Sequence, residues 1–149
     1  NINIARAVLA PLYKQLTHMG DVGSGQVTKI CNQMIVSCNV LVIAEMIALA
    51  QQAGVAAEKI PEALSGGFAD SSPLQIVGPE MATATFEPVK WRVKTLLKDL
   101  NMAVDLSIKQ GNAIPMSGLA AQLMQLHGTH GYMEQDPSTL IKLFTKNDA

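Results

Sequence analysis

A lysine and an asparagine follow a glycine-rich stretch, GDVGSGQVTKICNQ, at residues 20–33. Glycine is used where the backbone must turn sharply or approach a ligand closely, and a helix that starts there presents free N–H groups and about half a positive charge. Such a helix start suits an anion, for example a carboxylate. On a helix, Lys29 and Asn32 would share one face and present an ammonium group beside an amide. The stretch is therefore a candidate anion-binding site, although a plain surface lysine fits the same spacing.

The glycine stretch does not match either of the common nucleotide-binding loops. A P-loop requires Lys followed by Ser or Thr directly after Gly25, where this chain has Gln26 and Val27. A dinucleotide fingerprint requires a third glycine at the position of Thr28. The remaining interpretation is a tight loop that leads into a helix, with Ser24 as its N-cap.

Two other groups of residues could do chemistry. Lys98 and Asp99 stand between leucines in TLLKDLNMAV, where they could be an ion pair on an exposed helix face or a functional pair. His127 and His130 have the i, i+3 spacing of two metal ligands. No third ligand has a suitable spacing, so we predict no metal site.

The elements that must position these residues are predicted to be helical nearly throughout. Residues 26–53 contain no proline or glycine and carry apolar residues all round, which predicts one long helix, buried on most faces and stopped by Gly54. Five shorter helices follow, so the fold class is all-α. They are predicted near 57–65, from Ser71 or Ser72 with Pro73, over 92–110 up to Gly111, from Pro115, and from Asp136 and Pro137 to about Lys146.

The first residues do not fit a helical bundle. LTHM, within residues 15–19, is predicted to be a short strand, yet the chain offers no second strand to pair with it. We therefore expect residues 1–19 to be the tail of a larger domain and residues 20–149 to form the helical domain.

The composition predicts a covered apolar surface. Charged residues are 15% of the chain and hydrophobic residues 48%, against about 25% charged in a typical soluble protein. Residues 34–50 are the most apolar run, but they contain Asn39 and Glu45, and about 20 apolar residues are needed to span a membrane. A protein partner is thus a better prediction than a membrane.

Charge and cysteine content exclude further classes of protein. The formal net charge is −1 and the basic residues form no run, which argues against nucleic-acid binding. The two cysteines, Cys31 and Cys38, would lie two helical turns apart, roughly 10 Å, which is too far for a disulfide. We expect a reduced, cytoplasmic setting.

The stretch at residues 20–33 resembles the catalytic-domain motif of the β-hydroxyacid dehydrogenases, the family of 3-hydroxyisobutyrate dehydrogenase and tartronate semialdehyde reductase. The family pattern is G-x-x-G-x-G-x-x-x-K-x-x-N. Further matches follow in the expected order at 66–67 (GG), 98–100 (KDL) and 131–138 (GY…DPS). The family often has a second asparagine where this chain has Gln33. The motif itself falls on Gly20, Gly23, Gly25, Lys29 and Asn32.

The resemblance implies a two-domain enzyme of which this chain is the second half. An N-terminal Rossmann domain would bind NAD or NADP, and residues 1–19 would be its remnant. Residues 20–149 would be the all-α catalytic and dimerisation domain, a bundle like the C-terminal domain of 6-phosphogluconate dehydrogenase built on one long N-terminal helix. Alone, this half would be inactive. The whole protein is expected to be a homodimer or tetramer.

The resemblance also implies the role of each site residue. Lys29 would be the general acid/base in hydride transfer between a small β-hydroxyacid and its semialdehyde or keto form, and no metal is required. Lys98 would contact the cofactor. The alternative is a non-catalytic helical dimerisation or interaction module of the same fold. The residues expected to contact the substrate are Gly23, Ser24, Gly25, Asn32, Asp99 and Trp91.

Overall fold

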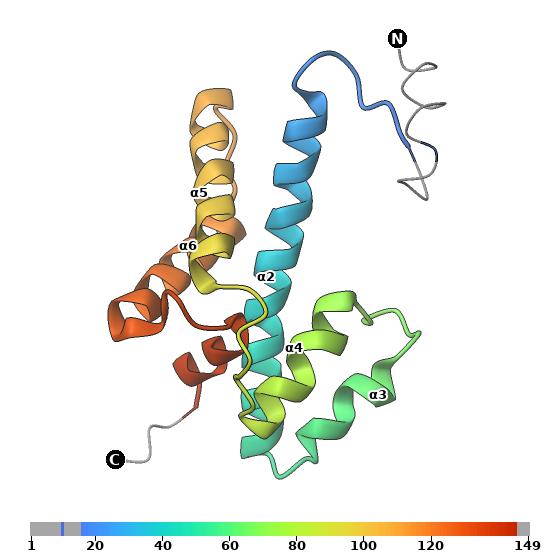
Figure 1. Ribbon diagram of the computed structural model, residues 1–149, viewed down its shortest axis with the longest axis vertical. Coiled ribbons are helices and arrows are strands. Elements are labelled where there is room, and N and C mark those ends of the chain that lie inside the picture. The colour runs from blue at the N-terminus through green and yellow to red at the C-terminus, as the bar shows by residue number, and fades with distance from the viewer. Residues whose placement is uncertain (1–9, 11–15, 146–149) are drawn as a thin grey trace.

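The computed structural model describes residue 10 and residues 16–145, and all regular structure in this part of the chain is helical (Figure 1). The predicted all-α class is therefore confirmed for the described residues. The elements are α2 (Ser24–Gln52), η2 (Ala57–Lys59), α3 (Ile60–Leu64), α4 (Ser72–Thr83), α5 (Val93–Gln110), α6 (Pro115–His127), η3 (Gly128–Tyr132) and η4 (Pro137–Leu143).

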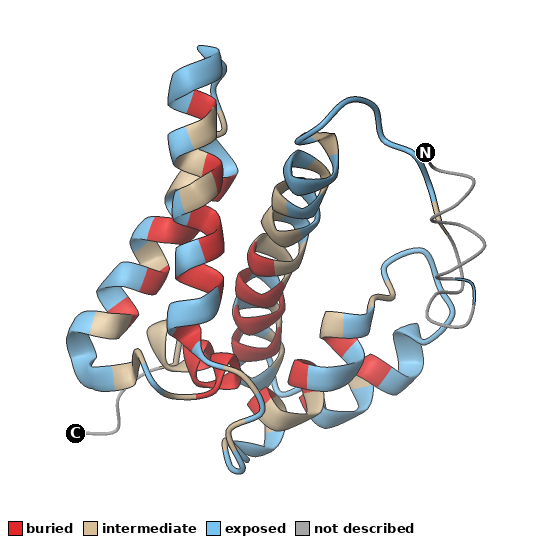
Figure 2. Cartoon of the chain, turned by 45° about the horizontal axis from the view of Figure 1, so that its top comes forward, coloured by how far each residue is buried: buried red, intermediate tan, exposed pale blue. Residues whose placement is uncertain are grey.

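The long helix α2 is the centre of the bundle. Helices α4 and α5 and the 3-10 helix η4 pack against it, and α6 packs mainly against α5. The buried residues of α2 lie in its middle and C-terminal part, while its first turns are exposed (Figure 2). The most buried side chains of the core come from five elements, which makes one shared hydrophobic core: Val40, Ile47, Val77, Leu100, Met124 and Leu140, each 0% exposed.

One face of α2 is not covered by the described chain. Ile35, Val42 and Leu49 are 71%, 52% and 69% exposed and recur every seven residues, so they form a stripe on one side of the helix. The prediction that α2 is buried on most faces is wrong along this line of residues, which the helices packed around α2 leave exposed. We call these three residues the α2 stripe.

Within the described residues, α2 alone is long and apolar enough to cross a membrane by length and composition. The central helix of a bundle passes the same test, because it too is apolar over many turns. The packing of α4, α5 and η4 on α2 is that of a central helix.

The start of α2 differs from the prediction. Gly23, not Ser24, is the N-cap, and Ser24 is the first helical residue. Gly23 has a φ of 100°, in the left-handed region that favours glycine. A serine cap would need an extended backbone at residue 24, and the glycine turn places that residue inside the helix instead. No side chain caps this helix end among the described residues.

The predicted strand is absent from the described part of its range. Residues 16–19 adopt no regular secondary structure, and residue 15 lies outside the described residues. A strand requires a neighbouring strand for its backbone hydrogen bonds. The described chain offers no second strand, so no strand forms at residues 16–19.

Most boundaries of the shorter helices agree with the prediction. The hydroxyl of Ser71 accepts a hydrogen bond from the backbone of Leu74 (3.1 Å) and caps α4, and Gly111 ends α5 with a φ of 68°. Pro61 lies in the first turn of α3, which follows the 3-10 turn η2. A backbone N–H at this position has no partner within the helix, so the N–H that proline lacks costs no hydrogen bond. The last helix was expected to reach about Lys146, but η4 is a 3-10 helix that ends at Leu143. Its hydrogen-bonding pattern is uncommon over long runs.

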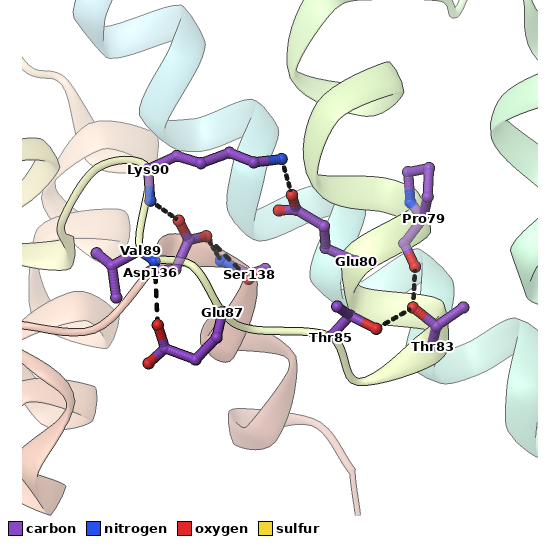
Figure 3. Close-up of polar contacts among 9 residues, drawn as sticks. All are labelled: Pro79, Glu80, Thr83, Thr85, Glu87, Val89, Lys90, Asp136 and Ser138. Atoms are coloured by element: carbon purple, nitrogen blue, oxygen red, sulfur yellow. Dashed lines mark hydrogen bonds and ion pairs between the residues drawn. The ribbon is translucent and has the colours of Figure 1, made fainter.

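The loop between α4 and α5 is held by a buried carboxylate (Figure 3). Asp136 is 1% exposed, and its Oδ1 accepts hydrogen bonds from the backbone N–H (3.0 Å) and the hydroxyl (2.8 Å) of Ser138. Its Oδ2 accepts a bond from the backbone N–H of Lys90 (3.0 Å). The Lys90 ammonium pairs with Glu80 of α4. Asp136 therefore joins the start of η4 to the loop that leads into α5.

The first turn of α5 is also fixed by this region. The backbone N–H groups of Val93 and Lys94 donate to the carbonyls of Gln135 and Met133, each at 3.0 Å. Free N–H groups at a helix start need such acceptors. The bonds position α5, and with it the Lys98–Asp99 pair, beside the first half of α2.

Candidate active site

A small cavity of about 70 Å³ lies between the first half of α2 and the middle of α5. Three of the predicted site residues meet there although they are far apart in the sequence: Lys29 comes from α2, and Lys98 and Asp99 come from α5. The full lining consists of Gln26, Lys29, Ile30, Gln33, Lys98, Asp99 and Met102. We call this cavity the lysine pocket.

A chain of hydrogen bonds connects the two helices across the lysine pocket. The side-chain amide of Gln33 donates to Oδ2 of Asp99 at 2.7 Å, over a sequence separation of 66 residues. The amide of Asn32 donates to Oε1 of Gln33 at 3.0 Å. Nζ of Lys98 lies 3.7 Å from Oδ1 of Asp99. Asn32 is thus connected to Asp99 through Gln33.

The charges of the lysine pocket favour an anionic ligand. Asp99 is buried, at 8% exposed, while the side chain of Lys98 is 68% exposed and Lys29 is exposed as well. Two lysines and one aspartate line the pocket, so its formal charge is one positive unit. The exposed ammonium groups remain able to donate hydrogen bonds to a ligand.

Gln33 is the site residue that the sequence reasoning undervalued. It stands where the family often has a second asparagine, and its amide makes the direct contact between α2 and Asp99. A glutamine is one methylene longer than an asparagine, and that length lets it reach the neighbouring helix. The available signal was its i+4 spacing from Lys29, which places both on one face.

The other predicted site residues lie outside the lysine pocket. Gly23, Ser24 and Gly25 form the start of α2, about one to two turns before Lys29. Trp91 precedes α5 and packs, half-buried, against the hydrophobic core. The structure therefore brings together one part of the predicted set and leaves the helix start and the tryptophan apart from it.

The two histidines are not arranged as metal ligands. His127 is buried, and its Nε2 lies 2.9 Å from the hydroxyl of Thr139. Burial, together with the positive charges of His130 and Lys142, lowers the pKa of His127 to about 4. Among residues 16–145, no group of three or more His, Cys, Asp or Glu side chains is placed to hold a metal ion.

Comparison with known proteins agrees with the family resemblance of the sequence. A family model described as the NAD-binding domain of NADP-dependent 3-hydroxyisobutyrate dehydrogenase matches residues 23–144, which include every residue of the lysine pocket. The chain belongs to the 3-hydroxyisobutyrate dehydrogenase family. The resemblance found in the sequence is therefore confirmed.

Relatives within the 3-hydroxyisobutyrate dehydrogenase family are similar over most of this chain. The 2-hydroxy-3-oxopropionate reductase of Escherichia coli is 31% identical over 131 residues, which are 88% of this chain and 44% of that protein. A 3-hydroxyisobutyrate dehydrogenase structure from Salmonella typhimurium has a TM-score of 0.84 at 21% identity, covering 94% of this chain and 50% of that one. This likeness shows the fold.

A second solved structure is the 3-hydroxyisobutyrate dehydrogenase of Mycobacterium tuberculosis with L-serine. It has a TM-score of 0.79 at 25% identity and covers 95% of this chain and 50% of that one. The chain thus spans about half the length of the relatives it matches.

Proposed function

We propose that this chain is the C-terminal catalytic domain of an NAD- or NADP-dependent oxidoreductase that interconverts a small β-hydroxyacid and its semialdehyde or keto form. The observation that carries the proposal is the meeting of Lys29, Lys98 and Asp99 in one positively charged pocket, in a chain of this family. In this proposal residues 1–19 are the end of an N-terminal Rossmann domain. Residues 20–149 form a bundle of the 6-phosphogluconate dehydrogenase C-terminal type.

Lys29 is the general acid/base in this proposal. A bound nicotinamide cofactor, contacted by Lys98, would supply the acceptor for a hydride from the carbon that carries the hydroxyl group. The amine of Lys29 takes the hydroxyl proton during oxidation and, as an ammonium group, returns it to the carbonyl oxygen during reduction. The ammonium also stabilises negative charge on that oxygen, so no metal is needed for this step.

The remaining residues bind and orient the substrate and the cofactor. The start of α2, from Gly23 to Gly25, offers backbone N–H groups to the substrate carboxylate. The amide of Asn32 holds a substrate oxygen, and Gln33 fixes that amide through its bond at 3.0 Å. Lys98 lies at the rim with an exposed ammonium group, which fits contact with a cofactor held mainly by the other domain.

The names of the relatives suggest the substrate class. One relative is named for the reduction of 2-hydroxy-3-oxopropionate, and one solved structure is described with L-serine. Both molecules are small acids with a hydroxyl group. A small cavity with one excess positive charge fits such a substrate.

The proposal is tested by assaying a protein in which this chain follows its own upstream domain. NAD(P)H formation is measured with 3-hydroxyisobutyrate, glycerate and L-serine, each against its methyl ester. We expect turnover with at least one free acid and much less with its ester, because the ester lacks the carboxylate. Absence of turnover with every acid and either cofactor would favour the alternative.

The alternative is a non-catalytic dimerisation or interaction module of the same fold. Such a module needs the helical packing but has no use for Lys29 and Asn32 on one face beside Asp99. The presence of all three favours the catalytic proposal.

Replacing Lys98 with alanine in the two-domain protein should weaken NAD(P)H binding by roughly tenfold, because a charge-assisted hydrogen bond is lost. The helix should be unaffected, since the Lys98 side chain is largely exposed. Lys94→Ala is the matched control on the same helix: its ammonium group pairs with Glu134 at 2.8 Å. Fluorescence titration measures both affinities. Equal NAD(P)H affinity in the Lys98 variant and the wild type would show that Lys98 does not contact the cofactor.

We also expect this chain to self-associate, most simply as a two-fold dimer. Val42 of the α2 stripe lines an apolar groove together with two exposed apolar residues of α6, Met116 (66%) and Leu119 (56%). Exposed patches larger than a few hundred Å² are uncommon on monomers.

Sedimentation at micromolar concentration measures this self-association. We expect a species heavier than the 15.9 kDa chain. Leu49→Lys should shift it towards the monomer, whereas Ile108→Lys, at an equally exposed position on α5, should not. A single species of chain mass in the wild type would show that this apolar face needs no partner.

A further inference from the structure

A second and larger cavity, of about 400 Å³, lies between the end of α6, η3 and η4. None of its lining residues lines the lysine pocket. The lining combines apolar side chains with hydrogen-bond donors, and no aspartate or glutamate belongs to it: it includes Leu126, His127, His130, Tyr132, Lys142 and Leu143. We call it the Lys142 cavity.

Lys142 supplies a positive charge that no carboxylate of the described residues neutralises. Its Nζ lies 4.7 Å from the ring centre of Tyr132 and 5.0 Å from that of Phe86, and it donates to the Tyr132 hydroxyl at 3.3 Å. No ion pair among residues 16–145 involves Lys142. The two rings hold the ammonium group in place by cation–π attraction. Two of its three protons remain for another acceptor.

Tyr132 is held rigidly beside this ammonium group. Its ring stacks on His127 with 4.4 Å between ring centres and 9° between ring planes. The hydroxyl of Thr139 donates to the carbonyl of Asp136 (2.7 Å), so it accepts from Nε2–H of His127 (2.9 Å). The Tyr132 hydroxyl accepts from Lys142 and keeps its own proton to donate. Two fixed donors thus line one cavity.

We propose that the Lys142 cavity binds a small organic monocarboxylate. The carboxylate accepts hydrogen bonds from Nζ of Lys142 and from the hydroxyl of Tyr132, and the hydrocarbon part lies against Leu126 and Leu143. A single fixed cation matches a monoanion better than a phosphate dianion, and the two leucines favour an apolar tail. The volume is within the range of small-molecule sites. The proposal does not depend on the function proposed for the lysine pocket.

The test is a titration of the chain with hexanoate, followed by calorimetry and by the NMR signals of the Tyr132 and His127 rings. We expect saturable binding with shifts of both rings, and no such shifts with hexanol, which has the tail without the charge. Lys142→Met should weaken binding about tenfold or more, as expected for a lost charged hydrogen bond. Lys59→Met, which removes an exposed lysine elsewhere, should bind as the wild type does.

A second variant covers the case in which Lys142→Met does not fold. Tyr132→Phe keeps the stacked ring and the cation–π contact and removes only the hydroxyl donor, so it should fold and bind several-fold more weakly. Saturable binding that neither variant weakens would overturn the proposal, as would the absence of saturable binding. Inorganic phosphate that binds in preference to hexanoate would overturn the carboxylate assignment.

Discussion

Replacing Lys29 with alanine is expected to lower the turnover of hydroxyacid oxidation about 100-fold or more in the two-domain protein. This is the usual scale for the loss of a general acid/base group. Alanine offers no group that can take the hydroxyl proton during hydride transfer. The helical fold should stay intact, because Lys29 is exposed and alanine is a good helix former. Circular dichroism and steady-state kinetics measure the two effects.

Two further variants separate proton transfer from positive charge. Lys29→Arg keeps the charge but should also lose activity, because guanidinium does not give up its proton near neutral pH. Lys59→Ala removes an exposed lysine of η2, outside the lysine pocket, and should leave turnover unchanged. Turnover of Lys29→Ala within a few-fold of the wild type would show that Lys29 is not the general acid/base.

Replacing Asp136 with alanine is expected to lower the free energy of unfolding by about 2–4 kcal/mol. The buried carboxylate accepts three hydrogen bonds, two from Ser138 and one from the backbone of Lys90. Alanine leaves those donors without an acceptor in a site from which water is excluded. Urea denaturation measures the loss as a lower midpoint.

Asp70→Ala is the matched control for this prediction. Asp70 also accepts two hydrogen bonds, from the backbone of Gly66 and the side chain of Gln75, each at 2.7 Å, but both are exposed. Water can replace the lost acceptor there, so the loss of stability should be clearly smaller. Equal losses in the two variants would show that burial of Asp136 adds nothing. Ser138→Ala, which removes one of the three donors and leaves the two backbone bonds to the carboxylate, should lie closer to the wild type.

Much of the fold could be predicted from local signals in the sequence. Helix ends are set by single residues with special chemistry, such as the Ser71 cap and the left-handed Gly111, and these were predicted correctly. The prediction of Ser24 as the N-cap of α2 was wrong, because a serine and a left-handed glycine both suit a helix start. The turn at Gly23 makes the glycine the N-cap. The prediction of a strand at residues 16–19 was wrong, because a strand forms only beside a second strand, which the local sequence does not reveal.

The candidate site shows the same division between local and distant information. The face shared by Lys29 and Asn32 follows from helical spacing within α2 alone. That Lys98 and Asp99 lie opposite Lys29 depends on how α5 packs on α2, and the family resemblance, not the spacing, suggested it. The bond from Gln33 to Asp99 joins residues 66 positions apart and could not be predicted locally.

The role of Lys29 is tested most directly by a single turnover with enzyme saturated by hydroxyacid and NAD(P). NAD(P)H formation is followed in the wild type and in Lys29→Ala after separate titrations have established that both bind cofactor and substrate. We expect similar affinities but a hydride-transfer step that is about 100-fold slower or more in the variant, because only the proton acceptor has been removed. A hydride-transfer rate in Lys29→Ala within a few-fold of the wild type would contradict the proposal that this pocket is the catalytic half of a hydroxyacid dehydrogenase site.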